Sequence, residues 1–165
     1  MAKKSIVVDA SLAAVLAKCH CIVFTPALKA EWNDHQSAFA RQWLVQMYAR
    51  KKVITVALDQ NTALRKGLLK TASNAANPEE QASNEQAIQK DCHLIEAALH
   101  TDKIIASYDG KARRLFAQAC LSIHEIRAIM WIMHDLDTPM EDIISWLENG
   151  APEVQEWQLY IAAEP

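Results

Sequence analysis

The chain has 165 residues, of which 51% are hydrophobic and 22% charged. A chain of this length can bury the core of one ordinary domain but is too short for two domains. We therefore expect a single domain over residues 1–165, with the segment 139–162 appended to its core. No run approaches the roughly 20 apolar residues of a membrane-spanning helix, and the opening MAKKS does not resemble a signal peptide. These features argue against a membrane protein and predict a soluble, cytoplasmic one.

Charge is unevenly distributed along the chain. The net charge is -3, but residues 36–78 carry +6 and the remainder carries -9. Such a basic segment can present a cationic surface to a polyanion, although clustered Lys and Arg are more often a solvated face. The candidate phosphate contacts in it are Lys51, Lys52, Arg65 and Lys66.

The cysteines and histidines do not indicate a zinc site. Cys19 and Cys21 are separated by a single residue, and the other two cysteines are isolated. Structural zinc sites usually place two to four residues between paired cysteines. We therefore expect free thiols, and we interpret the six scattered histidines as surface or core residues.

The N-terminal part of the chain reads as two buried strands joined by a short helix. The β-branched runs at 5–10 and 21–25 predict strands, and 11–18 predicts the helix between them. Thr25 followed by Pro26 is a helix start signal, because Pro lacks an amide hydrogen that would be unpaired at that position. The helix that begins there carries Glu31.

The middle of the chain predicts two helices and then a loop. Residues 36–50 have the period of an amphipathic helix, with Arg41 and Gln46 on its polar face. Its expected apolar face is formed by Phe39, Trp43, Leu44 and Met47. We expect Asp59 to cap the next helix, which runs through Leu64, Leu68 and Leu69, and the polar segment 71–85 to be a loop.

The remainder alternates between helices and strands. Helices are predicted at 86–100, 110–119, from Thr138-Pro139 to Asn149-Gly150, and at 152–161. Strands are predicted at 103–107 and 126–133, the second chosen over a buried helix for its β-branched and aromatic content. Alternation of this kind predicts an α/β fold with a parallel sheet of about four to five strands and right-handed crossovers.

Acidic residues follow two of these strands. Asp9 ends the run IVVD, and Asp109 comes shortly after KIIAS. Ligands of open parallel sheets bind beyond the carboxyl ends of the strands, so both positions are candidates for a site. Each also has a structural interpretation, since Asp109 can cap the following helix and Asp9 can form a turn.

Asp91 and Glu31 complete the candidate set. Asp91 lies three residues after Ile88 and four before Ile95, which places it on the buried edge of its helix. A buried carboxylate needs a compensating cation, either a basic side chain or a metal ion. Glu31 is near a helix start, where acids are favoured in any case. Four carboxylates gathered at one rim would select Mg²⁺ or Mn²⁺, which prefer oxygen ligands.

In these motifs the chain resembles the PIN-domain nucleases. The resemblance rests on Asp9 in IVVDAS, Glu31 in TPALKAEW, Asp91 in KDCHLIEAAL, and Ser107 and Asp109 in IIASYDGKAR. The order covers most of the chain, but the segment between Asp9 and Cys21 is shorter than is usual in that family. The resemblance implies a three-layer α/β/α sandwich and a metal-dependent endoribonuclease, a class that includes toxins of bacterial toxin–antitoxin pairs.

The resemblance also implies roles for these residues. Asp9, Asp91, Asp109 and Glu31 would bind one or two Mg²⁺ or Mn²⁺ ions, and Ser107 would orient a carboxylate. RNA would be the substrate. Three other expectations stay open: a catalytically inactive PIN-like module that binds RNA or protein, a toxin held by an antitoxin protein, and a homodimer formed through aromatic residues such as Trp43 and Trp157.

Overall fold

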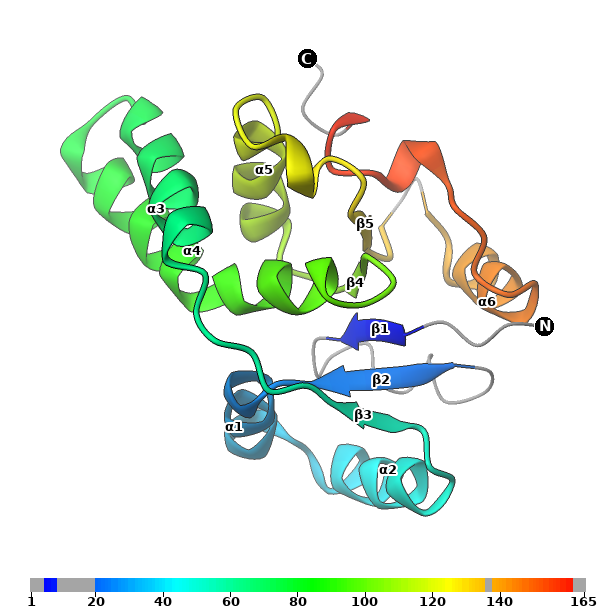
Figure 1. Cartoon of the computed structure of the whole chain (residues 1–165). Coiled ribbons are helices and arrows are strands. Elements are labelled where there is room, and N and C mark those ends of the chain that lie inside the picture. Colours follow the sequence, from blue (N-terminus) through cyan, green and yellow to red (C-terminus); the bar gives the residue numbers. More distant parts are fainter. Residues whose placement is uncertain (1–4, 9–19, 136–137, 162–165) are drawn as a thin grey trace.

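A computed structural model of the chain describes residues 5–8, 20–135 and 138–161. Its helices and strands alternate along most of the chain (Figure 1). The strands are β1 (Ser5–Val8), β2 (Cys21–Phe24), β3 (Val53–Thr55), β4 (Ile104–Ala106) and β5 (Met130–Ile132). The helices are α1 (Pro26–His35), α2 (Ala38–Ala49), α3 (Thr62–Thr71), α4 (Pro78–Leu99), α5 (Gly110–Ala119) and α6 (Met140–Glu148). The α/β class predicted from the sequence is confirmed.

All strand pairs of the sheet are parallel, in the order β3-β2-β1-β4-β5. The chain therefore builds outward from β1 to β3 on one side and then returns to add β4 and β5 on the other. The order reverses between β1 and β4, where Val8 is in register with Ala106. In open parallel sheets such a reversal opens a crevice at the carboxyl ends of the two strands, which is where ligands bind.

Several helix starts agree with the sequence signals. The backbone N–H of Leu28 donates to Thr25 Oγ1 at 3.2 Å, and Pro26 is the first residue of α1, as predicted. Asp109 caps α5, because its Oδ1 accepts from the N–H of Ala112 at 2.8 Å. In both cases the side chain satisfies an amide that the helix itself leaves unpaired.

The predictions for the middle of the chain are partly wrong. Asn61, and not Asp59, caps α3 by accepting from the N–H of Leu64 at 3.0 Å. The predicted loop at 71–85 is mostly helical, since a 3-10 turn (Ala72–Asn74) leads directly to α4. Asn77 caps α4 and Pro78 begins it, so the signal Asn-Pro-Glu-Glu outweighs the polar composition that suggested a loop.

Three other elements differ from expectation. The sequence analysis gave no strand at Val53–Thr55, a short edge strand that begins directly after two lysines. The strand predicted at 126–133 is confined to Met130–Ile132, after a 3-10 turn at His124–Ile126. The helix predicted at 152–161 is only a 3-10 turn, Gln155–Trp157, followed by a backbone bridge from Gln158 to Met130. The predicted helix at 11–18 lies outside the described residues.

The hydrophobic core includes α2, although not as the sequence pattern suggested. Trp43, Leu44 and Met47 are buried as expected, with Trp43 stacked near Trp32 at 5.8 Å between ring centroids. Phe39, which was assigned to the same face, is 62% exposed. The small side chain of Ala40 is buried beside Trp43 instead. Because Trp43 is a core residue, it does not support the homodimer expectation.

Two substitutions on α2 test this orientation of the helix. Met47 is 1% exposed and Phe39 is 62% exposed. We expect Met47→Ala to lower the free energy of unfolding by about 2–5 kcal/mol, because it leaves a cavity in the core. Phe39→Ala should change it by no more than about 0.5 kcal/mol. Urea denaturation of both variants checks this, and a large loss for Phe39→Ala would contradict the described packing.

Candidate functional site

The site is built at the carboxyl edge of the sheet, where the strand order reverses. Asp9 follows Val8 in the sequence but lies outside the described residues. On the neighbouring strand, Ser107 is buried and its Oγ accepts from the backbone N–H of Asp109 at 3.1 Å. This bond fixes the turn that leads from β4 into α5, with Asp109 at its end.

Two acids from different helices meet near one lysine. Asp91 of α4 is buried, and Lys90 Nζ lies 3.7 Å from its Oδ1. The same nitrogen lies 3.7 Å from Oε1 of Glu31 on α1. The same ammonium group therefore lies near both Glu31 and Asp91, two of the four predicted metal ligands.

His93 is a further neighbour of Glu31 that the sequence analysis did not identify. Its Nε2 lies 3.4 Å from Glu31 Oε2, and its side chain is mostly buried. Burial lowers the pKa of His93, while the nearby Glu31 carboxylate acts in the opposite direction. The net lowering favours neutral imidazole at neutral pH, and Nε2 is buried without a hydrogen-bond partner among the described residues.

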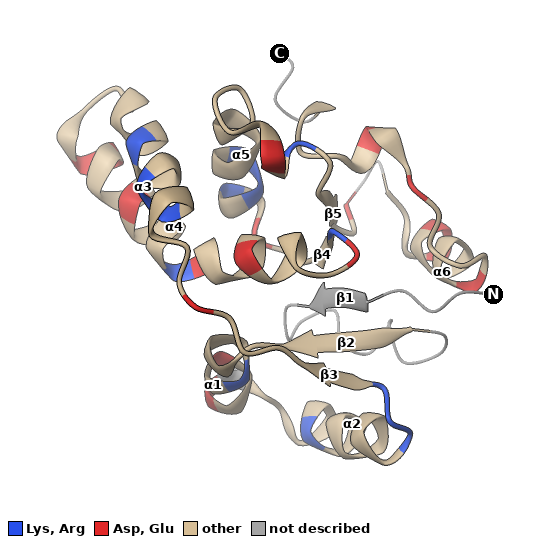
Figure 2. Ribbon diagram, in the orientation of Figure 1, with Lys and Arg blue, Asp and Glu red and all other residues tan. Residues whose placement is uncertain are grey.

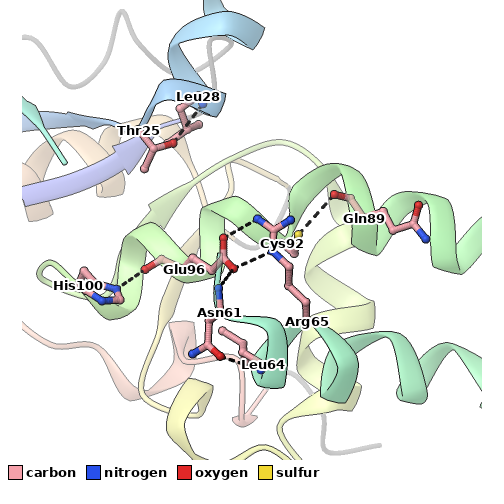
Figure 3. A network of polar contacts seen from close by, with 9 residues as sticks. All are labelled: Thr25, Leu28, Asn61, Leu64, Arg65, Gln89, Cys92, Glu96 and His100. Carbon is pink, nitrogen blue, oxygen red and sulfur yellow. Dashed lines mark hydrogen bonds and ion pairs between the residues drawn. The ribbon is translucent and has the colours of Figure 1, made fainter. Parts of the chain in front are cut away.

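A second acid on α4, Glu96, is tightly paired (Figure 3). Arg65 of α3 donates from Nε to Oε1 and from a terminal nitrogen to Oε2, both at 2.7 Å. The backbone N–H of Asn61 also donates to Oε1, at 2.9 Å. Burial by itself would raise the pKa of Glu96, but the bonds from Arg65 and Asn61 outweigh it and lower the pKa. This pair joins α3 to α4.

A cavity of about 170 Å³ lies beside these groups. His93, Arg65 and Glu96 line it together with residues that follow β2 and β3. Those residues are Thr25, Pro26, Ala27, Leu58 and Gln60. The cavity is therefore next to the Glu31–His93 pair, on the side of the sheet edge where a ligand is expected.

The predicted phosphate contacts do not form one surface (Figure 2). Lys51 and Lys52 precede β3 and so lie at the amino-terminal edge of the sheet, whereas Asp109 follows the carboxyl end of β4. Arg65 is engaged by Glu96. Lys66 lies on the exposed side of α3 and, unlike Lys51 and Lys52, comes after the carboxyl end of β3 in the chain.

The four predicted metal ligands are not gathered into one cluster in the described part of the chain. Among residues 5–8, 20–135 and 138–161 there is no group of three or more His, Cys, Asp and Glu side chains placed to hold a metal ion. Asp9, the central member of the predicted set, is outside those ranges. Of the other three, Glu31 and Asp91 lie near the same lysine, and Asp109 caps α5 just after β4.

The Arg65–Glu96 pair makes stability depend on pH. Since the pKa of Glu96 is lowered in the folded state, its contribution is present above the unfolded value, near 4.5, and is lost as the pH falls through the folded pKa. We expect Glu96→Gln to lower the free energy of unfolding by about 3 kcal/mol at neutral pH, because Arg65 loses its partner.

Urea denaturation between about pH 3 and pH 7 checks this prediction. The difference between wild type and Glu96→Gln should narrow toward the acid end of that range. Arg41→Gln, which removes an exposed arginine of α2, is the matched control and should follow the wild type. A difference that stays constant with pH would show that the charge of Glu96 does not stabilise the fold.

Comparison of the chain with protein-family models, curated proteins and solved structures finds no match. In the described residues, no helix is long and apolar enough to cross a membrane. The function proposed below therefore depends on the side chains of this chain and on the sequence resemblance to PIN-domain nucleases.

Proposed function

We propose that the protein is a Mg²⁺- or Mn²⁺-dependent endoribonuclease. The observation that carries the proposal is the meeting of Glu31 and Asp91, from α1 and α4, at one ammonium group beside the reversal point of the sheet. Such a reversal is where open α/β sheets bind their ligands. Carboxylates that converge there from separate helices are oxygen donors suited to a hard cation.

The residues present fit a divalent cation. Asp91 is only 3% exposed, so its charge needs compensation within the fold. Lys90 is 59% exposed, and its Nζ lies 3.7 Å from one oxygen of each acid. Because the ammonium reaches solvent, it can move away when a divalent cation takes over the compensation of the buried Asp91 carboxylate.

Asp9 and Asp109 would extend the site along the sheet edge. Val8, which precedes Asp9, is in register with Ala106, which precedes Ser107. Neighbouring strands of a sheet lie about 4.8 Å apart, so the carboxyl ends of β1 and β4 lie close together. Asp109 uses Oδ1 to cap α5, and its second carboxylate oxygen remains able to accept or coordinate.

A bound Mg²⁺ or Mn²⁺ would supply Lewis acidity, lowering the pKa of a water molecule and offsetting charge on the attacked phosphate. The chain's own residues have simpler tasks. Glu31, Asp91, Asp109 and Asp9 would hold the ion, Ser107 would fix the backbone that presents Asp109, and His93 would orient Glu31. Lys66 would contribute sequence-independent attraction for the RNA backbone.

We also propose that the layers form the three-layer α/β/α sandwich that the resemblance to PIN domains implies. Right-handed crossovers would put α1 and α2 on one face of the sheet and α3, α4 and α5 on the other, because the direction of strand addition reverses after β3. The contacts of α4 with β1 and β4, and of α1 with β2, show that both helices pack against the sheet. The toxin interpretation, with an antitoxin as partner, has the sequence resemblance alone as its support.

One alternative function has a specific observation in its favour. If Lys90 were the permanent counter-charge of Glu31 and Asp91, the edge would be neutralised without metal. The protein would then be a module that binds RNA or a protein partner and does not cleave. The two functions differ in whether a divalent cation binds, which is directly measurable.

Metal binding should stabilise the folded protein. With Mn²⁺ in about hundredfold excess over its dissociation constant, the melting temperature should rise by about 5–10 °C. Asp91→Asn should abolish both this rise and the cleavage of single-stranded RNA, because it removes charge and keeps volume. Differential scanning fluorimetry and a gel-based cleavage assay are the two measurements.

Two further variants make the result specific. Asp34→Asn removes an exposed acid of the same helix as Glu31 and should leave the rise and the cleavage unchanged. Lys90→Met removes the competing ammonium and should tighten Mn²⁺ binding. If wild type shows no Mn²⁺-dependent stabilisation while Lys90→Met is strongly destabilised, the nuclease proposal is wrong and the binding module is favoured.

A further inference from the structure

A second cavity lies away from the carboxylate pair, between the start of α4, the end of α3 and α5. Its volume is about 270 Å³, larger than that of the cavity beside His93. Its walls are mainly polar and carry amide, hydroxyl, carboxylate and guanidinium groups. The lining residues include Asn74, Glu80, Asn84, Arg114, Leu115 and Gln118.

Asn84 is the most informative residue of this cavity. It is only 7% exposed, yet its side-chain amide makes no hydrogen bond with any residue in the ranges that the structure covers. The amide atoms themselves are not enclosed, because neither is among the fully buried side-chain atoms that lack a partner, so they are accessible from the cavity. Asn84 lines the cavity, so its donor and acceptor are available to a molecule bound there.

The opposite wall supplies a cation and a second amide. Arg114 and Gln118 are four residues apart on α5, so they share one face of that helix. Lys111 donates to Ser83 Oγ at 2.6 Å, which fixes the first turn of α5 against α4 next to Asn84. The two walls of the cavity are therefore held in a defined relation to each other.

This combination matches the chemistry of a nucleotide. Asparagine and glutamine amides pair with base edges through one donor and one acceptor. Arginine binds phosphate through its planar fork of donors. Pockets for drug-sized ligands measure about 300–1,000 Å³, so this volume suits a ligand of about one base with its sugar.

The position of the cavity relates it to the proposed cleavage site. Asn84 and Asp91 are seven residues apart on α4, two turns of helix, and both belong to its buried side. Seven residues span about 10.5 Å along a helix axis, so the cavity lies one short step beyond the carboxylate pair. Figure 2 shows Lys and Arg on both α3 and α5, the helices that flank this stretch of α4.

We propose that this cavity binds a single nucleotide, with Asn84 contacting the base edge and Arg114 contacting the phosphate. When the nucleotide belongs to an RNA strand, the cavity gives the enzyme a preference for the base that flanks the cleaved bond. That source of the nucleotide rests on the proposed function. A free mononucleotide offers the same chemistry and is the other source.

The test measures binding without divalent metal, so that cleavage does not affect it. The full chain in EDTA is titrated into fluorescently labelled single-stranded RNA homopolymers of each base, and separately into the four nucleoside monophosphates by calorimetry. Asn84→Leu keeps the size of the side chain and removes its hydrogen bonds. Arg114→Gln removes the charge of an exposed residue, so it is expected to fold normally. Arg41→Gln on α2 is the matched control for lost positive charge.

We expect the wild type to prefer one base. Asn84→Leu should weaken binding of that base about tenfold and leave the other bases nearly unchanged. Arg114→Gln should weaken all four about equally and reduce the salt dependence by about one counterion. Arg41→Gln should do neither. Circular dichroism of Asn84→Leu verifies that the fold is kept, and Arg114→Gln tests the cavity independently if it is not.

The outcomes separate this inference from the nuclease proposal. RNA binding that loses its base preference in Asn84→Leu supports the cavity as a subsite for RNA. Binding of a monophosphate that depends on Arg114, with no RNA binding, supports a free-nucleotide site and contradicts the ribonuclease function. If neither ligand binds, or if both variants bind as the wild type does, the inference is wrong even where RNA is cleaved.

Discussion

Buried negative charge on α4 is the constraint on which the rest of the structure depends. This helix contacts α1, α3, α5, β1 and β4, so it is the element around which the others pack. It carries two buried carboxylates, Asp91 and Glu96. Each must be compensated inside the fold, because an isolated buried charge would cost several kcal/mol. The two carboxylates are compensated in different ways, one by an arginine that joins two helices and the other by a lysine shared with Glu31.

The groups that compensate Glu96 lie within hydrogen-bonding distance, whereas the lysine that faces Asp91 is farther away. Glu96 receives two bonds from Arg65 and one from the amide of Asn61, all between 2.7 and 2.9 Å. These bonds hold the carboxylate and the guanidinium in fixed positions, although both groups also line the cavity beside His93. The ammonium of Lys90, by contrast, is 3.7 Å from Asp91 and largely in solvent, and it is shared with Glu31. A counter-charge that can be exchanged is a property of a binding site, whereas a saturated one belongs to the framework.

Local signals in the sequence were sufficient where a single side chain decides the structure. The Thr25-Pro26 start of α1, the Asp109 cap of α5 and the stop at Asn149-Gly150 each follow from one backbone group that needs a partner. A signal of the same kind is present at Asn77-Pro78, but the polar composition around it favours a loop. Polarity there reflects an exposed helix face and not the absence of a helix.

The sequence does not reveal which charged side chains pair with each other across the fold. Glu96 was not singled out, although an acid inside the apolar run LIEAAL was a visible sign that a basic partner exists elsewhere. The charge of its partner, Arg65, predicts an RNA contact, since charge counts along a chain do not distinguish a guanidinium paired with a carboxylate from one that faces solvent. Lys51 and Lys52 were grouped with it, but β3 separates them from the carboxyl edge of the sheet. Basic residues that are close in the sequence therefore lie at different edges of the sheet when a strand runs between them.

The spacing of polar residues on α4 suggests how one helix can serve several purposes. Asn84, Asp91 and Glu96 interrupt an otherwise apolar buried side formed by Ile88, Cys92 and Ile95. Each interruption faces a different neighbour: a polar cavity, an exchangeable lysine and a fixed arginine. Since the Arg65–Glu96 pair anchors the C-terminal half of α4 to α3, the positions of Asp91 and Asn84 follow from it by helix geometry alone. A rigid anchor at one end thus sets the distance between the carboxylate pair and the cavity, which is the geometry that a strand bound across both would need.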